Sequence, residues 1–204
     1  VNTTFSRYSK VLAPSGMTGA ESARRVLEAN GVTGVRIERI SGNLTDHFDP
    51  KTNTIRLSES VYDATTVSAV GVAAHEAGHA VQYAVGYAPM QLRAAIIPAT
   101  NIGSQLAMPL VLLGLIFSSA MLVDIGIVAF SMSTMFQLVT LPVEFNASRR
   151  AVVTLESSCV SDTEVKGAKA VLRAAALTYV AALAVSLASL LRIILLFGNR
   201  NRRD

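Results

Sequence analysis

The sequence predicts a mostly α-helical membrane protein, with a small α+β N-terminal portion and about three transmembrane helices. Apolar residues make up 51% of the 204-residue chain, and charged residues only 16%. Residues 1–93 carry nine Lys/Arg and eight Asp/Glu, whereas 94–123, 125–143 and 174–191 carry no charge. Because about 20 apolar residues cross the hydrocarbon core of a bilayer, these uncharged stretches indicate membrane-spanning helices.

We expect an N-terminal portion at residues 1–104 and a membrane portion at 105–204. The first helix of the N-terminal portion has clear end signals. Thr18 and Glu21 fit a capping box, with Thr18 as the N-cap, and Gly31 is a natural stop just beyond the helix.

Two short strands are predicted next. VRIERI, residues 35–40, alternates apolar and polar side chains as a half-buried strand does, and TIRLS, residues 54–58, has the composition of a second strand. The loop between them, 41–53, is rich in turn residues. We expect the two strands to pair as a hairpin across this loop.

A longer helix is predicted from about Thr66 to Tyr83. It consists largely of Ala, Val and Gly, and Glu76 is almost its only charge, which indicates a helix buried on most of its surface. Gly86 is the expected stop. Pro89 and Pro98 are expected to break the segment that leads to the membrane.

The membrane portion is expected to form a helical hairpin followed by a final span. Each hairpin helix is close to the minimum spanning length, so the second returns the chain to its starting side. The predicted order is a span at 105–123, a tight turn at Asp124–Gly126, a span at 127–142, a polar helical segment at 144–169 and a last span at 174–197.

The segment from His75 to His79, HEAGH, is an HExxH motif and contains two of the three histidines in the chain. On a helix, positions i and i+4 share a face, so both imidazoles can reach one zinc ion. Glu76 could then take a proton from the attacking water and pass it to the leaving amine. The alternative is an accidental match on a buried helix. The scarcity of histidine, and the cost of an unpaired carboxylate in an apolar helix, argue against it.

A hydrolytic zinc site normally has a third protein ligand, and no histidine follows the motif, so we expect a carboxylate. Glu144 is favoured because it ends the returning span, where a carboxylate beside the bilayer is costly without a role. The alternative for Glu144 is a helix-end charge at the interface. The other candidate acids are Asp124, Glu156, Asp162 and Glu164.

Four segments carry a resemblance to a known family: SGNLTDHFDP, IRLSESVY, GVAAHEAGHAVQ and QLVTLPVEFNASRRA. In this order they resemble the YugP-like family of neutral zinc metallopeptidases of bacterial membranes, over nearly the whole chain. HExxH with a later E-F-x-A segment also resembles, more distantly, the HtpX-like membrane peptidases. The resemblance implies a zinc endopeptidase with His75 and His79 as Zn²⁺ ligands, Glu144 as third ligand and Glu76 as base.

The sequence departs from these families in two places. The HtpX-like pattern has an Asp four residues after the ligand Glu, able to orient a zinc-binding histidine, but this sequence has Ser148 there. The groups that orient the histidines are therefore unassigned. Family members also usually begin with one more apolar span before the region corresponding to Phe5–Lys10, and this sequence starts without it.

The third histidine, His47, has two interpretations. It could be a catalytic group that stabilises the oxyanion beside the zinc, which the resemblance supports, or a loop residue tied to Asp46 or Asp49. Arg149 and Arg150 also have two. They could pair near the third ligand or with a substrate carboxylate, or they could mark the cytoplasmic end of a span.

We therefore expect a membrane-embedded zinc metalloendopeptidase acting on membrane or membrane-adjacent polypeptides, with an exposed strand such as 54–58 holding the substrate extended. The alternative is a non-enzymatic membrane scaffold whose structural zinc has four protein ligands. A transporter is disfavoured because Asp124 and Glu144 lie at span ends. Nucleic-acid binding has little support, because the basic residues are scattered among acidic ones.

Basic residues near the span ends suggest how the protein is oriented in the bacterial cell membrane. The larger number lies on the side of the motif, which favours a cytoplasmic catalytic side. The single cysteine, Cys159, excludes an internal disulfide and is expected to be a small buried or interfacial residue. The basic residues on the motif side are Arg93, Arg149, Arg150, Lys166, Lys169 and Arg173, against Arg200, Arg202 and Arg203.

Overall fold

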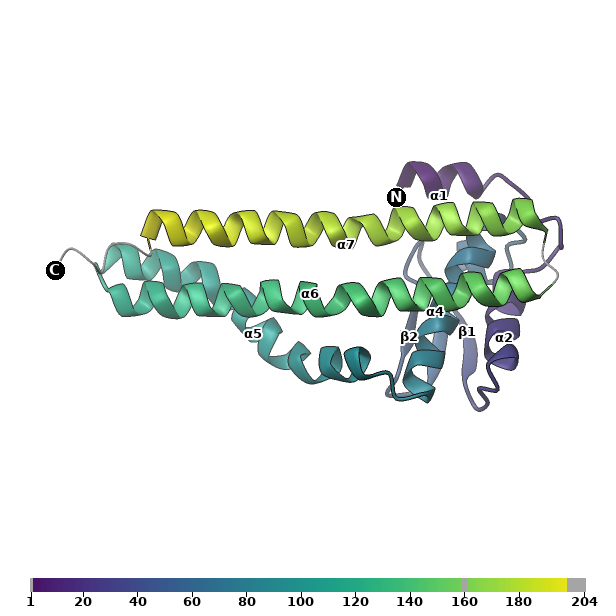
Figure 1. Cartoon of the computed structure of the whole chain (residues 1–204), viewed down its shortest axis with the longest axis horizontal. Helices are drawn as coiled ribbons and strands as arrows, with labels where there is room; N and C mark the ends of the chain where they lie inside the picture. The colour runs from purple at the N-terminus through teal and green to yellow at the C-terminus, as the bar shows by residue number, and fades with distance from the viewer. Residues whose placement is uncertain (1, 159–160, 198–204) are drawn as a thin grey trace. The chain divides into compact units, whose positions relative to one another are not determined.

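The computed structural model describes residues 2–158 and 161–197, and most of them are helical (Figure 1). The predicted fold class, a mostly helical chain with a small N-terminal sheet, is confirmed. Cys159 and the three C-terminal arginines lie outside the described residues. The elements are α1 Asn2–Tyr8, α2 Gly19–Ala29, β1 Arg36–Ile40, β2 His47–Asp49, β3 Thr54–Ser58, α3 Glu59–Tyr62, α4 Val67–Ala84, α5 Ala88–Ile116, α6 Ala120–Ser157 and α7 Asp162–Phe197.

The chain forms two compact units that are not continuous in sequence. The mixed unit combines residues up to Met90 with Val143–Thr178, and the helical unit combines Gln91–Pro142 with the residues from Tyr179 onward. Helices α6 and α7 each contribute a segment to both units. The expected boundary between residues 104 and 105 divides the chain into two continuous parts, and it stays a prediction.

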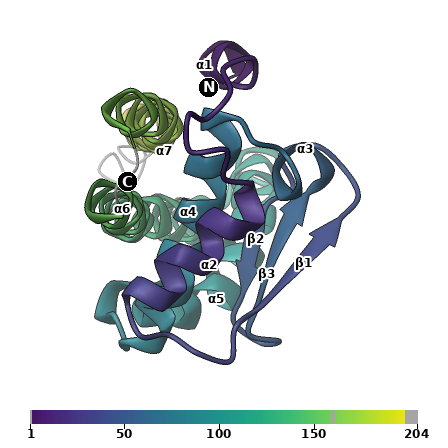
Figure 2. The ribbon, with the colours of Figure 1, turned by 90° about the vertical axis from the view of Figure 1, so that its right-hand side faces the viewer.

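The sheet of the mixed unit has the strand order β1-β3-β2 (Figure 2). The predicted hairpin between 35–40 and 54–58 is wrong, because β1 and β3 are parallel. The antiparallel partner of β3 is β2, which lies inside the predicted loop. With only three residues, β2 is too short to show an alternating pattern. Strand β3 is therefore central and bonded on both sides, so it is not the exposed strand that we expected.

Helix α2 begins and ends as the sequence predicts. The Thr18 hydroxyl accepts a hydrogen bond from the Glu21 amide at 3.2 Å, and the Glu21 carboxylate accepts one from the Thr18 amide at 2.8 Å. The Thr18 amide and the Thr18 hydroxyl both donate to the Glu21 carboxylate, and these two bonds lower the pKa of Glu21. Gly31, just beyond the helix, has a φ of +65°. The buried face of α2, which includes Val26 and Leu27, packs against α4.

Helix α4 is buried on nearly every side. It starts after Thr66, whose hydroxyl accepts from the Ala69 amide, and it contains the HExxH motif. At Gly78 a Cβ atom would lie 2.5 Å from the Ala147 carbonyl oxygen of α6. At Gly71 it would lie 3.2 Å from the Cα of Ala168 in α7. Backbones can approach this closely only where side chains are absent, so these glycines allow α4 to contact both helices.

The turn between α5 and α6 lies at residues 117–119, where Ser118 has a φ of +51°. The predicted turn at Asp124–Gly126 is therefore wrong, and Asp124 is a residue of α6. The predicted break at Pro98 is also wrong, because α5 continues through it. A proline removes only one helical hydrogen bond, and neighbouring helices can compensate for that loss in a membrane.

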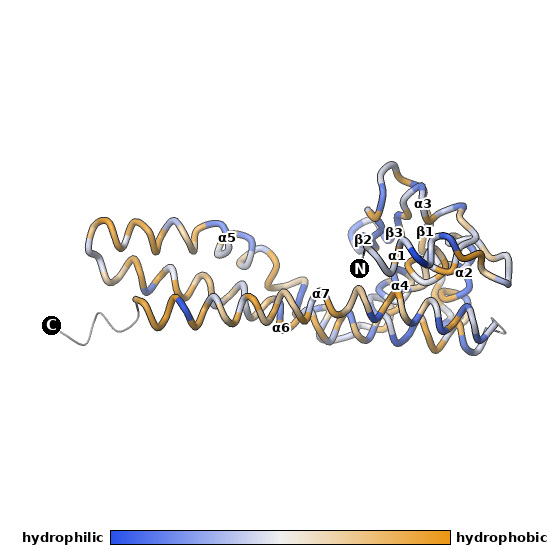
Figure 3. Tube along the Cα trace, turned by 90° about the horizontal axis from the view of Figure 1, so that it is seen from above, coloured by the Kyte–Doolittle hydropathy of each residue, from blue (hydrophilic) through white to orange (hydrophobic). Residues whose placement is uncertain are grey.

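Three helices are long and apolar enough to cross a membrane: α5, α6 and α7. Their apolar residues are orange in Figure 3. In the helical unit, a Cβ at Gly126 of α6 would lie 2.9 Å from the Ala107 carbonyl oxygen of α5, so the hairpin is closely packed. The buried hydroxyls of Thr134 and Ser186 are 2.7 Å apart and link α6 to α7 in this unit.

We expect Gly78→Ala to destabilise the protein. The new methyl group would overlap the α6 backbone at Ala147, and overpacking of this kind costs about 1–3 kcal/mol. Thermal unfolding of the purified variant measures the effect. Gly71→Ala is the matched comparison, because its methyl group meets Ala168 at 3.2 Å and the neighbours need to shift less. Wild-type stability in Gly78→Ala would contradict the packing described above.

Candidate metal centre

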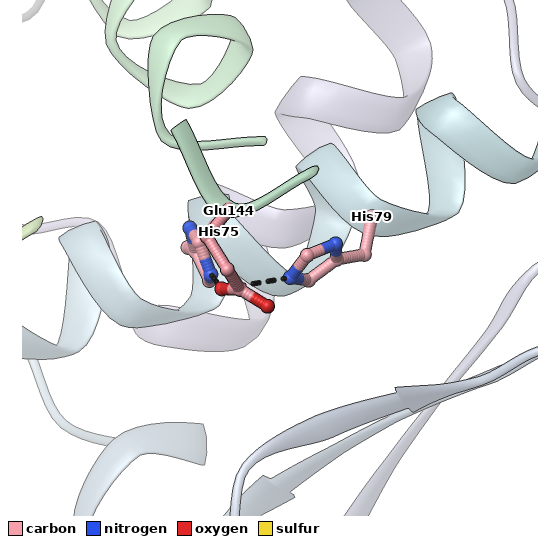
Figure 4. Close-up of side chains that lie close together, drawn as sticks. All are labelled: His75, His79 and Glu144. Atoms are coloured by element: carbon pink, nitrogen blue, oxygen red, sulfur yellow. Dashed lines mark hydrogen bonds and ion pairs between the residues drawn. The ribbon is translucent and has the colours of Figure 1, made fainter. Parts of the chain in front are cut away.

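Three side chains from two helices converge in the mixed unit (Figure 4). His75 and His79 lie one turn apart on α4, and Glu144 lies on α6. Their potential ligand atoms all lie within 4.8 Å of one another. Glu144 Oε2 is 3.3 Å from His75 Nε2 and 3.6 Å from His79 Nε2. The expected third ligand is thus beside both histidines of the motif.

These distances fit a metal ion shared by the three side chains. Two ligand atoms at about 2.0–2.1 Å from a tetrahedral zinc are separated by about 3.3 Å. Direct N–H···O hydrogen bonds are usually shorter, with a mode near 2.9–3.0 Å. Two imidazoles and a carboxylate are also a donor set that suits zinc. The geometry and the chemistry of the group therefore both fit Zn²⁺.

Gln82 determines which nitrogen of His79 faces the group. Its amide nitrogen donates to the Val143 carbonyl at 2.8 Å and to Asn146 Oδ1 at 3.0 Å, so its oxygen must be the atom beside His79. That oxygen is 3.0 Å from His79 Nδ1 and can only accept. His79 therefore carries its proton on Nδ1, and the lone pair of Nε2 points toward Glu144.

Ser148 contacts His75 in the way that Gln82 contacts His79. Its hydroxyl is 3.1 Å from His75 Nδ1, which leaves His75 Nε2 toward Glu144. The serine thus stands where the HtpX-like pattern has an Asp, and it contacts a histidine from there. Sequence reasoning missed the role of Gln82. The available signal was a further polar side chain, three residues after His79, on a helix made largely of Ala, Val and Gly.

Arg150 supports the same network from α6. Its Nε donates to Asn146 Oδ1 at 2.8 Å, the oxygen that also accepts from Gln82. One of the expected interpretations, a pairing near the third ligand, agrees with this contact. Arg149 is exposed and lies in a separate groove, described below.

The surroundings of His79 favour positive charge. Burial lowers the pKa of His79, but the Glu144 carboxylate 3.6 Å away and the nearby charge of Glu76 raise it, and the net shift is upward. The negative charges that stabilise a proton on the buried His79 imidazole also attract a metal cation to the same place. The electrostatics therefore suit a metal ion as well as the geometry does.

Glu76 is buried, with 9% of its surface exposed. In residues 2–158 and 161–197, no hydrogen bond from another protein group occupies its carboxylate. It is therefore available to bind a water molecule next to His75, its neighbour in the motif.

His47 is exposed on the edge strand β2, and its Nδ1 lies 2.8 Å from the Thr45 carbonyl oxygen. His47 does not bond to Asp46 or Asp49, the two expected partners. Asp46 accepts a hydrogen bond from Ser58 instead, and Asp49 accepts one from Arg56. His47 is not a member of the three-residue group. Its catalytic role stays a prediction.

The other candidate acids have different surroundings. Glu164 is fully buried and accepts hydrogen bonds from the amide and hydroxyl of Ser15, at 3.2 and 2.8 Å. Glu156 and Asp162 are exposed. Asp124 belongs to the helical unit. Of the five acids, Glu144 is the one that groups with the histidines in the described structure.

We expect Gln82→Ala to weaken zinc binding by about 10–100-fold, the usual effect of removing a group that orients a metal ligand. Competition with a coloured zinc chelator measures the affinity. Tyr83→Phe, at the next position of α4 where the side chain is half exposed, is the control and should bind zinc like the wild type. Equal affinities for all three proteins would show that Gln82 does not orient His79.

Comparison with known proteins identifies the family of the chain. Residues 1–198 match the family described as "Putative neutral zinc metallopeptidase". The chain is also 48% identical to "Putative membrane protease YugP" of Bacillus subtilis (strain 168), over 200 residues that cover 98% of this chain and 89% of that protein. No solved structure matches the chain. The match over nearly its whole length shows that the chain belongs to this neutral zinc metallopeptidase family.

Proposed function

We propose that this protein is a membrane zinc endopeptidase with a gluzincin-like site. His75, His79 and Glu144 hold Zn²⁺, and Glu76 is the general base. The observation that carries the proposal is the convergence of Glu144 on the Nε2 atoms of both histidines. The hydrogen bonds to their Nδ1 atoms support it, because they keep both rings in the orientation that metal binding requires.

The roles of the residues follow from their chemistry. Zinc, when bound, acts as a Lewis acid that polarises the scissile carbonyl. Glu76 accepts a proton from the water that attacks the carbonyl carbon. As the C–N bond breaks, the Glu76 carboxyl returns this proton to the leaving nitrogen, and a carboxylic acid and an amine are released.

An open coordination position would distinguish a catalytic zinc site from a structural one. A structural zinc normally has four protein ligands, whereas a catalytic one has three and an open position. Within the described residues the group has three members. This count favours the peptidase over the scaffold.

Strand β2 replaces β3 as the proposed strand for the substrate. Because β3 is paired on both sides, the free edges of the sheet belong to β1 and β2. Of these two edge strands, β2 packs against α4, the helix of the motif. An extended polypeptide can add to a free edge through main-chain hydrogen bonds. His47 lies on this strand, which supports a role for it beside the reacting carbonyl.

The membrane setting suggests the class of substrate. Glu144 follows directly on the uncharged stretch 125–143, and the relative from Bacillus subtilis is named "Putative membrane protease YugP". We therefore propose that the substrates are membrane or membrane-adjacent polypeptides. The basic residues on the motif side support a cytoplasmic catalytic side in a bacterial cell membrane.

Glu76→Gln should retain zinc and the fold but lose at least about 10²–10⁴-fold in peptide hydrolysis, because the amide cannot accept the proton of the attacking water. Cleavage of casein by the purified protein, together with its zinc content, measures both properties. If Glu76→Gln bound zinc fully and cleaved casein as fast as the wild type, Glu76 would not be the general base.

Glu144→Ala should lower both zinc affinity and hydrolysis, because it removes one of three ligands. Zinc content after dialysis against a weak chelator gives a readout that is independent of activity. Glu156→Ala is the control, an exposed acid farther along α6 that is expected to keep zinc and activity. If Glu144→Ala kept full zinc affinity, another carboxylate would have to be the ligand.

Orientation can be tested with one introduced cysteine. Lys51 is exposed in the turn between β2 and β3, so Lys51→Cys in a Cys159→Ser background places a single thiol on the mixed unit. We expect a membrane-impermeant maleimide to label it in lysed cells and not in intact cells. Labelling in intact cells would put the mixed unit outside.

A further inference from the structure

A groove of about 480 Å³ lies between α6 and α7 within the mixed unit. Its walls combine two kinds of side chain, basic and apolar. The α6 wall consists of Phe145, Ser148, Arg149, Val152, Val153 and Glu156, and the α7 wall consists of Lys169, Leu172, Arg173 and Ala176.

Three cations of the groove lack a partner among the residues that the structure describes. Arg149, Lys169 and Arg173 are exposed, and none of them forms an ion pair or hydrogen bond with another group in residues 2–158 and 161–197. The groove has one acid, Glu156, which leaves two positive charges in excess. A ligand that suits these side chains is therefore an anion.

The apolar wall calls for a ligand with a hydrocarbon part. Leu172 and Ala176 are buried at the groove, while Phe145 and Val153 remain half exposed. Inorganic phosphate would satisfy the cations but leave the exposed surfaces of Phe145 and Val153 in water. An amphiphile would cover both.

The basic residues of the groove lie close to the ends of the uncharged stretches, where lipid headgroups are expected. Arg173 directly precedes the uncharged stretch 174–191. Arg149 lies six residues after the stretch 125–143, about 9 Å along a helix. The polar layer of a bilayer extends about 5–8 Å beyond the hydrocarbon on each side, within reach of long basic side chains.

We propose that this groove binds an anionic phospholipid. Arg149, Lys169 and Arg173 hold the headgroup phosphate, and an acyl chain lies along Phe145 and Val153, the exposed apolar side chains of the groove. The alternative is that these basic residues only set the orientation of the spans in the membrane. That role would not require them to line one groove together with apolar side chains. Ser148 lines the groove and also contacts His75, so the lipid would sit next to the metal centre.

Native mass spectrometry of the full chain in detergent tests the proposal. The probes are phosphatidylglycerol, phosphatidylcholine and inorganic phosphate. The wild type should prefer phosphatidylglycerol to phosphatidylcholine, and millimolar phosphate should not displace it. Each basic residue near anionic lipid contributes about fivefold in affinity, so Arg149→Gln, Lys169→Gln and Arg173→Gln together should reduce binding by roughly 100-fold.

Two further variants separate a site from general surface charge. Replacing Lys10, Arg24 and Lys51 by Gln removes the same charge from exposed positions elsewhere on the mixed unit, and it should leave the lipid preference unchanged. Glu156→Gln removes the only acid of the groove and should tighten phosphatidylglycerol binding by about fivefold. This gain cannot result from misfolding.

Several outcomes would overturn the proposal. One is an equal affinity of the wild type for the two lipids, and another is an equal loss in the groove and control triple variants. Displacement of the lipid by inorganic phosphate would indicate a site for the free ion. A preference for an apolar peptide with a free carboxylate over phosphatidylglycerol would indicate a polypeptide-docking groove.

Discussion

The direct contact between the backbones of α4 and α6 is the constraint on which the metal centre depends. HExxH supplies two ligands from one helix, and the third must come from a helix far along the chain. Gly78, inside the motif, lets the two helices approach, and Gln82 joins them through the Val143 carbonyl and Asn146. A metal site needs its ligands placed to within about 0.5 Å, which side chains held on packed helices can provide.

Several polar groups buried in the mixed unit are hydrogen-bonded, and these bonds join distant segments. Glu164 accepts two hydrogen bonds from Ser15, which ties the loop before α2 to the start of α7. The Ser22 hydroxyl donates to the Val70 carbonyl and links α2 to α4. An unbonded polar group in such a core would cost about 1–3 kcal/mol, so each bond also favours one arrangement of helices.

The α6 segment from Val143 to Ser157 uses its two faces differently. Its buried face carries Glu144 at the metal centre and then small or apolar residues against α4, among them Ala147 and Ala151. Its outer face carries Phe145, Arg149, Val153 and Glu156 in the groove. Within each set the residues recur with the helical period of about 3.6 residues, so the two sets lie on different faces of the helix. One helix thus connects the proposed peptidase site with the proposed lipid site.

Sequence alone determined the features that depend on residues close together in the chain. The capping box at Thr18, the limits of α4 and the common face of His75 and His79 follow from helical spacing, and the uncharged stretches follow from composition. Glu144 could also be selected, because few acids follow the motif and Glu144 is the one that ends the expected returning span.

Only the tertiary structure decided the features that join distant segments. The parallel pairing of β1 with β3 depends on β2, which is too short to predict, and the turn at 117–119 carries no charge to mark it. The roles of Gln82 and Ser148 appear only once α6 lies against α4. Local spacing can predict which side chains share a helix face. It cannot predict which distant group they meet, because that partner is chosen by the packing of the whole core.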